Sequence, residues 1–203
     1  MALMKSIRVA VAACSLLGAA LTTGCASVYV DNALKDVDQA DIHAPTTPQA
    51  TQLIFEFQTN GSSNATATAH LKQQVFELVQ QSKLFADVSE TPVTGENLLS
   101  LVINNVVLTD DAAAKGFITG LTFGAAGSAV TDGYICTIEY QAGNQSAPIQ
   151  KTVRHAIHTT LGAKEAPPNA VKAASLDDAV KTMTRQIVRN GLKELSHDPA
   201  FQK

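Results

Sequence analysis

Apolar residues recur at two different spacings between residues 51 and 198, and the order of these spacings limits the folds open to the chain. In residues 52–58 (QLIFEFQ) alternate positions are apolar, which predicts a strand with one buried face. A helix is predicted next, from a cap at Ser63 or Asn64 to about Ser82. Its apolar residues form one stripe that would face the core: Leu71, Val75, Leu78 and Val79.

The middle of the chain is predicted to be mainly strand. Residues 83–89 turn into a short strand, and residues 97–108 (NLLSLVINNVVL) are nearly continuously apolar, which favours burial on both faces. Residues 134–140 and 149–160 alternate, and the turn-rich residues 141–148 between them predict a hairpin with a long loop.

A second helix is predicted to end the domain. Ser175 and Asp178 have the spacing of a capping box, and the helix would run through Leu195. The residues predicted to face inward are Leu176, Val180, Met183 and Ile187. The order β-α-β-β-(apolar glycine-rich insert)-β-β-α predicts an α+β two-layer sandwich, with two main helices on a mostly antiparallel sheet of about five strands. This domain would span residues 51–198, with a tail at 199–203.

The amino terminus has the parts of an export signal. Lys5 and Arg8 precede an uncharged run over residues 9–23, which is shorter than the roughly 20 residues that span a bilayer. A leader that is removed over residues 1–24 therefore explains the run better than a permanent helix does.

The end of this leader, residues 21–25 (LTTGC), resembles the lipobox of bacterial lipoprotein precursors. Gly24 matches the small residue before the cut and Cys25 matches the lipidated thiol, whereas Thr22 stands where leucine is commonest. The alternative is ordinary secretory cleavage with an incidental cysteine. The resemblance implies a diacylglycerol on the sulfur of Cys25 and an acylated amino group. Because no Asp follows Cys25 directly, it also implies an outer-membrane location facing the periplasm.

A second resemblance implies fold only. Leu71, Phe76, Leu78, Ser82, Leu84, Phe85 and Val88 have a spacing similar to that of small periplasmic lipoprotein domains of the curli-export and penicillin-binding-protein-activator type. In those domains a strand, a helix and a small-x-Leu/Arg-Phe-x-x-Val pattern open the fold. A shared fold does not confer a shared function.

Residues 25–50 are predicted to be the lipidated cysteine followed by a flexible acidic tether. They carry four aspartates and a Pro-Thr-Thr-Pro run without a sustained period, and such segments rarely bury enough apolar surface to offset the entropy of ordering. Residues 28–30 (VYV) could instead add a short strand or lie at the membrane surface.

Residues 116–131 (GFITGLTFGAAGSAVT) contain no charge, and small residues recur in them at every fourth position. On a helix this stripe would allow close approach of another backbone, as in membrane helix pairs. Such a helix would be about 24 Å long, short of the roughly 30 Å hydrocarbon core. The residues predicted to contact a membrane or a second copy are Gly116, Phe117, Gly120, Leu121, Gly124 and Ser128. The alternative is a flexible apolar loop, or a glycine-bearing strand packed on the domain's own sheet.

The residues indicate no catalytic chemistry. His155 and His158 would point to opposite faces of a strand and could not easily share a metal ion, so neither a metal nor a cofactor is expected. Cys136 would be a buried, inert thiol, and the pair at 110–111 (DD) a solvated loop end. With 15 basic and 18 acidic residues, the chain lacks the basic excess of a nucleic-acid binder, and no small-molecule substrate is evident.

The expected function is therefore that of a non-enzymatic lipoprotein, anchored in the outer membrane, whose domain binds an envelope protein or a copy of itself as a scaffold or accessory factor. One alternative is an oligomeric lipoprotein that inserts residues 116–131 into the membrane. Another is a periplasmic immunity or inhibitor protein that uses its acidic face.

Overall fold

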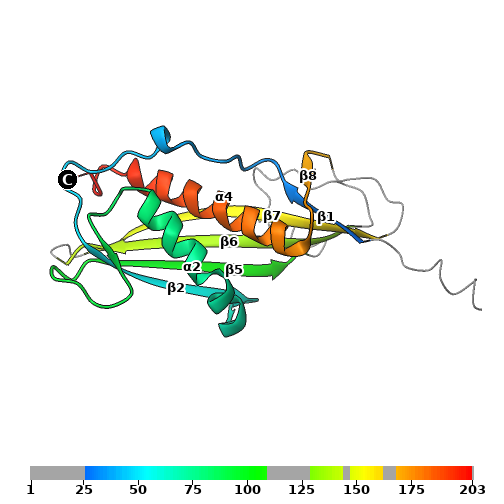
Figure 1. Ribbon diagram of the computed structural model, residues 1–203, viewed down its shortest axis with the longest axis horizontal. Coiled ribbons are helices and arrows are strands. Elements are labelled where there is room, and N and C mark those ends of the chain that lie inside the picture. Colours follow the sequence, from blue (N-terminus) through cyan, green and yellow to red (C-terminus); the bar gives the residue numbers. More distant parts are fainter. Residues whose placement is uncertain (1–25, 109–128, 144–146, 162–167, 203) are drawn as a thin grey trace, which may run out of the picture.

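The computed structural model describes residues 26–108, 129–143, 147–161 and 168–202, and these form two layers (Figure 1). The helices are α2 (Ala65–Gln81) and α4 (Leu176–Ser196), with a short 3-10 turn, η2, at Gln39–Asp41. The strands are β1 (Ala26–Asp31), β2 (Thr51–Thr59), β3 (Ser62–Ser63), β4 (Val88–Ser89), β5 (Leu98–Val107), β6 (Ala129–Gln141), β7 (Ile149–Leu161) and β8 (Ala170–Lys172).

All described strands belong to one sheet, in the order β3-β2-β5-β6-β7-β1-β8, with β4 also paired to β2. The chain passes through α2 between β2 and β5, and these two strands are parallel. The neighbours β5, β6, β7 and β1 are antiparallel. The two-helix α+β fold is confirmed. Among the described residues the sheet has eight strands instead of about five. The short strand predicted within residues 83–89 is present as β4, whereas β1 lies in the predicted tether and β3 and β8 are too short to show a period in the sequence.

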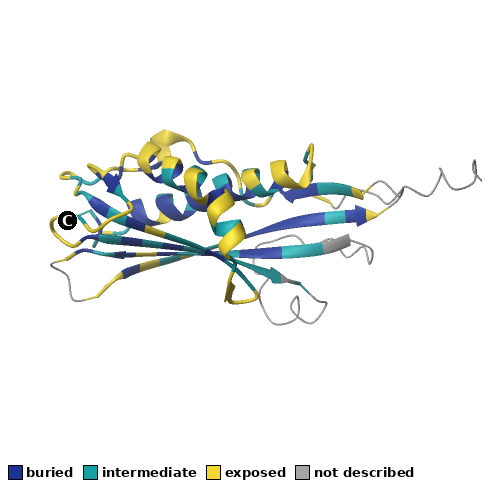
Figure 2. Cartoon of the chain, turned by 60° about the horizontal axis from the view of Figure 1, so that its bottom comes forward, coloured by how far each residue is buried: buried dark blue, intermediate teal, exposed yellow. Residues whose placement is uncertain are grey.

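The two helices cover one face of the sheet, and the core lies between the layers (Figure 2). Leu99, Leu101 and Ile103 of β5 are fully buried, whereas Leu98 and Val102, which alternate with them, are only half-buried. The prediction that this strand is buried on both faces is therefore wrong, since helices pack on only one side.

Both predicted helix starts are present. The side chain of Asn64 accepts a hydrogen bond from the backbone N–H of Ala67 at 3.0 Å, and Ser175 Oγ accepts one from Asp178 at 3.1 Å. The carboxylate of Asp178 reaches the N–H of Ala174 instead of that of Ser175, so only half of the predicted capping box forms. Leu176, the first residue of α4, is 58% exposed instead of inward, whereas Ala179, Met183 and Ile187 of the same helix are fully buried.

Residues 26–50 do not form the predicted flexible tether. Ala26–Asp31 is strand β1, and the residues after it run alongside α4 (Figure 1). The side chains of Arg189 and Asn190 donate to the carbonyls of Val37 and Lys35 at 3.0 and 2.8 Å. Val37 and Ile42 are buried in the core cluster. The segment is ordered because α4 supplies both an apolar surface and partners for its backbone.

At one end of the sheet β1 and β6 begin, and β5 and β7 finish. We call this end of the sheet the β1 end. The carboxyl terminus and the β6–β7 hairpin lie at the opposite end (Figure 1). Among the described residues, no helix is long and apolar enough to cross a bilayer.

Candidate functional site

A buried polar array joins β1 to β7 and β6. The carboxylate of Asp31, the last residue of β1, lies 3.3 Å from Nε2 of His158 on β7. Nδ1 of the same imidazole lies 2.9 Å from the hydroxyl of Thr131 on β6. The second carboxylate oxygen of Asp31 accepts a hydrogen bond from the N–H of Ala33. Asp31 and His158 are 1% and 2% exposed, so this line of groups is shielded from water.

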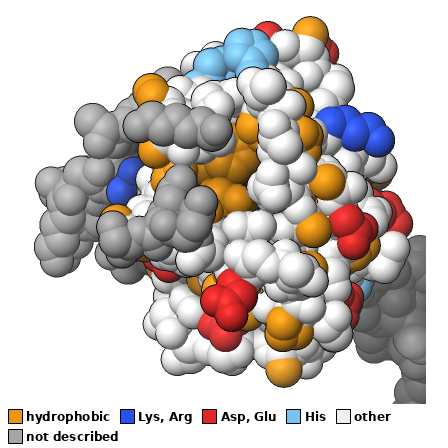
Figure 3. Space-filling view, turned by 90° about the vertical axis from the view of Figure 1, so that its left-hand side faces the viewer, with side chains coloured by type: hydrophobic (Ala, Val, Ile, Leu, Met, Phe, Trp, Pro, Cys, Tyr) orange, Lys and Arg blue, Asp and Glu red, His pale blue; other side chains and the backbone are white. Residues whose placement is uncertain are grey.

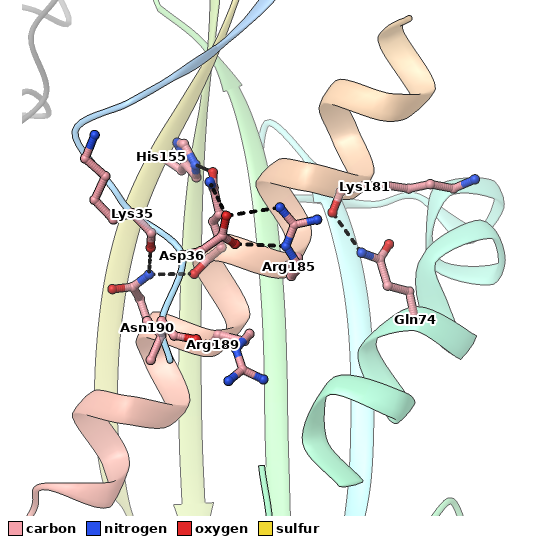
Figure 4. A network of polar contacts seen from close by, with 10 residues as sticks. Lys35, Asp36, Gln74, His155, Lys181, Arg185, Arg189 and Asn190 are labelled. Carbon is pink, nitrogen blue, oxygen red and sulfur yellow. Dashed lines mark hydrogen bonds and ion pairs between the residues drawn. The ribbon is translucent and has the colours of Figure 1, made fainter. Parts of the chain in front are cut away.

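A second line of hydrogen bonds joins β7 to α4 (Figure 4). Nδ1 of His155 accepts from the N–H of Ala156, which leaves the proton of the neutral ring on Nε2, 2.8 Å from the side-chain oxygen of Gln186. Burial lowers the pKa of His155 below its usual 6.5, against the opposing effect of the bond to Gln186, and this favours the neutral ring.

The same line continues from α4 to the segment after β1 (Figure 4). The amide of Gln186 donates to the carboxylate of Asp36 at 3.3 Å. Arg185 donates two hydrogen bonds to Asp36, at 2.8 and 3.2 Å, in a forked pair. The hydrogen bond from Arg185 is the main reason why the pKa of Asp36 lies below its ordinary 3.8. Asp36 therefore stays ionised and joins residues 32–50 to the helix.

A cleft of about 310 Å³ lies beside this array, between β1, β8 and the first turns of α4. We call it the β1 cleft. Both signs of charge line it, from Asp31, Asp36, Lys172, Asp178 and Arg185. Polar groups of Asn32, Thr182 and Gln186 add hydrogen-bonding capacity. A cleft at the small end of the range for ligand sites, with mixed charge, suits a polar segment of a partner better than an apolar molecule.

Some of the site residues predicted from the sequence lie within the described part of the chain, and others lie outside it. Gly24 and Cys25, Asp110 and Asp111, and Gly116, Phe117, Gly120, Leu121, Gly124 and Ser128 lie outside the described residues. Cys136 is confirmed as fully buried, and burial raises the pKa of its thiol to about 12. His155 hydrogen-bonds to Gln186 on α4, whereas His158 contacts Asp31 of β1 and Thr131 of β6. The two histidines therefore have separate partners. Within the described part of the chain, no cluster of three or more His, Cys, Asp or Glu residues could hold a metal ion.

Sequence reasoning missed the residues that complete the array. It placed Asp31 and Asp36 in a tether and Thr131 at the end of the glycine-rich insert, and it gave no role to Arg185 or Gln186. The one available signal was the short run at residues 28–30 (VYV), for which a strand was one of two interpretations. A strand there places Asp31 at the sheet, but the identity of its partner depends on strand order.

No family model matches this chain, and no curated protein matches it. Several solved structures are similar to this chain at low sequence identity and low TM-score. A PelC dodecamer from Paraburkholderia phytofirmans is 10% identical, with 83% of this chain and 98% of that chain covered and a TM-score of 0.34. A neuraminyllactose-binding hemagglutinin homolog from Helicobacter pylori is 11% identical, with 79% and 90% covered and a TM-score of 0.40. Rare lipoprotein B from Shewanella oneidensis is 13% identical, with 71% and 93% covered and a TM-score of 0.33. These likenesses assign no function to this chain.

Proposed function

We propose that this chain is an outer-membrane lipoprotein, anchored through Cys25, whose α+β domain works without catalysis as an accessory or scaffold unit for an envelope assembly. The observation that carries the proposal is the pairing of Ala26, the residue directly after the lipobox-like cysteine, with Leu161 in the sheet. Cleavage before Cys25 would remove residues 1–24 without cutting any described element. The new amino terminus would then lie one residue from the sheet.

The anchor follows from the chemistry that the lipobox implies. Each buried methylene contributes about 0.8 kcal/mol to membrane attachment, and one chain alone binds reversibly. Two or three acyl chains on Cys25 would hold the domain at the bilayer permanently. Removal of the leader takes away Lys5 and Arg8 and no acidic residue, which changes the formal net charge from −3 to −5.

The anchor is tested on the full precursor expressed in a Gram-negative host. Mass spectrometry should find an amino-terminal peptide that begins at Cys25 and carries diacylglycerol, and gradient fractionation should place the protein with outer membranes. Cys25→Ser is the matched control and should abolish both results. A released chain with an unmodified Cys25 would contradict the proposal.

Binding is proposed at the β1 cleft because acidic and basic side chains both line it and could pair with charged or polar groups of a partner segment. Thr182 lines the cleft and is half-buried, whereas Gln73 is exposed on α2. A photoreactive residue at Thr182 should give one discrete adduct in envelopes, either with an envelope protein or with a second copy. The same probe at Gln73 should not give that adduct. Identical adducts from both positions would contradict binding at the cleft.

The second candidate, an oligomer that inserts residues 116–131 into the membrane, is favoured by one observation. Leu108 and Ala129 flank the intervening residues, and both lie toward the β1 end, because Leu108 bonds to Thr131 and Ala129 pairs with Thr160. Thr160 also pairs with Ser27, so the flanks lie at the same end of the sheet as the proposed anchor. Substitution of Gly120 and Gly124 by leucine should then alter the assembly state, measured by size-exclusion chromatography with light scattering in detergent. An unchanged state would remove this candidate.

A further inference from the structure

Two exposed histidines from distant parts of the chain lie side by side at the end of the molecule opposite the β1 end. His43 follows η2 in the segment after β1, and His197 caps the carboxyl end of α4. The centroids of their rings are 4.5 Å apart, and the ring planes are inclined by 49°. Figure 3 looks at this end and shows histidine side chains gathered at its surface. Both imidazoles are therefore accessible to ions in the surrounding water.

The hydrogen bonds of His197 determine which of its ring nitrogens can bind an ion. Nδ1 lies 2.8 Å from the carbonyl oxygen of Lys193, which can only accept, so Nδ1 carries the proton of the neutral ring. The hydroxyl of Ser196 lies 3.3 Å from the same nitrogen, but it donates its own proton to the Lys193 carbonyl at 2.7 Å. The lone pair of the ring is therefore on Nε2. Histidines that bind metal ions have this arrangement, in which one nitrogen donates to a carbonyl and the other binds the metal.

The backbone of His43 is fixed by contacts with the carboxyl-terminal residues. Its N–H donates to Oγ of Ser196 at 3.2 Å, and its carbonyl accepts from the side-chain amide of Gln202 at 2.8 Å. Ile42, directly before it, is buried in the core cluster. Backbone contacts and packing thus bring the two histidines together, so little further ordering is needed for both rings to bind one ion.

Positive charges beside the pair would oppose the binding of a cation, and carboxylates offset two of them. Lys193 lies one turn before His197 on α4, and its ammonium group is 3.6 Å from the carboxylate of Asp41. Lys151 pairs at 2.7 Å with Asp198, the residue directly after His197. Because each ammonium group has a carboxylate beside it, its repulsion of a bound cation is reduced.

We propose that His43 and His197 together bind a divalent transition-metal ion, with Cu²⁺ as the preferred ion. With metal–nitrogen bonds of about 2.1 Å, two imidazoles at a right angle on one ion have centroids roughly 4.5 Å apart, and at a tetrahedral angle roughly 5 Å apart. The spacing in the structure fits the right angle, which is typical of tetragonal Cu²⁺ sites. Among the divalent ions of the first transition row, Cu²⁺ also binds nitrogen donors most strongly.

The site supplies two protein ligands, so water would occupy the remaining positions of the ion. It is therefore an exchangeable surface site, unlike a closed structural site with four protein ligands. An ion bound to both rings would join the segment after β1 to the carboxyl end of α4. The site is independent of the lipidation of Cys25.

The test is pulsed electron paramagnetic resonance on the full chain, purified in detergent without a histidine tag and mixed with one equivalent of Cu²⁺. The method counts bound imidazoles, because their remote ring nitrogens modulate the electron spin echo. The unmodified protein should show two imidazoles. His43→Gln and His197→Gln should each show no more than one, and each should raise the apparent Kd for Cu²⁺ at least tenfold. His70→Gln, at an exposed histidine of α2, is the matched control and should change neither value.

The substituted side chains are all exposed, so each variant should keep the fold, and a cooperative urea transition without metal checks this for each one. One imidazole or none in the unmodified protein would overturn the site without reference to any variant. A signal of two imidazoles that persists in His43→Gln or in His197→Gln would overturn it as well, because the ion would then be bound elsewhere.

Discussion

The carboxylate of Asp31 faces Nε2 of His158 at 3.3 Å in a site that excludes water, although 127 positions separate the two residues in the chain. This contact, with the hydroxyl of Thr131 on the other ring nitrogen, joins strand β1 to strands β7 and β6.

Removal of one member of this pair should be costly. Asp31→Ala removes the carboxylate beside the buried imidazole of His158, and we expect the free energy of unfolding to fall by about 1–3 kcal/mol. Asp31→Asn keeps an acceptor oxygen and should lose less. The control is Lys72→Ala, which breaks the exposed ion pair with Glu90 and should cost less than about 1 kcal/mol. Urea denaturation measures all three, and equal losses for Asp31→Ala and Lys72→Ala would refute the prediction.

His155 should make stability depend on pH. Burial lowers the pKa of His155 in the folded protein, so the unfolded chain binds a proton more readily. The stability that the neutral ring contributes is therefore fully present above about pH 6.5 and is lost as the pH falls through that value toward the folded pKa. The urea midpoint should decline across this window, and less steeply in His155→Gln. His43→Gln, at an exposed histidine, is the control. The same slope in all three proteins would show that His155 is not responsible.

Cys136 should be unreactive in the folded domain. Its side chain is fully buried and burial raises the pKa of the thiol to about 12, so almost no thiolate forms at neutral pH. In a chain of residues 26–203, where it is the sole cysteine, we expect no reaction with iodoacetamide until a denaturant is added. Rapid alkylation of the native domain would mean that β6 opens to solvent.

The segment after β1 should resist proteolysis while α4 binds it. Lys35 is an exposed tryptic site, but its carbonyl accepts from Asn190 and the adjacent Asp36 is paired with Arg185. The double variant Arg185→Ala, Asn190→Ala should be cut after Lys35 faster than the unmodified domain, because local unfolding becomes easier. Lys181→Ala, at an exposed position on the same helix, should not change the rate. Equally fast cleavage in the unmodified domain would support a flexible tether instead.

Much of the fold could be predicted because the relevant forces act locally. The stripe that includes Leu71 and Val75 predicts α2, Asn64 and Ser175 cap their helices through neighbours three residues away, and the β6–β7 hairpin follows from alternation on both sides of a turn-rich loop. Leu176 marks the limit of this reasoning. Its spacing places it on the apolar stripe, yet it is exposed at the start of α4, whereas Ala179 in the same turn is fully buried.

By itself, the sequence determined two helices and the central strands, since periodicity and caps are properties of neighbouring residues. The leader that ends at a lipobox-like cysteine stays a prediction from its charge-free run. Only the tertiary structure decided the role of residues 26–50. Their acidic, proline-bearing composition favours disorder, but the sheet edge offered by β7 and the donors Arg185, Arg189 and Asn190 on α4 compensate for the lost entropy. The pairing of Asp31 with His158, and of Ala26 with Leu161, depends on which strands are neighbours, and strand order is a property of the whole chain.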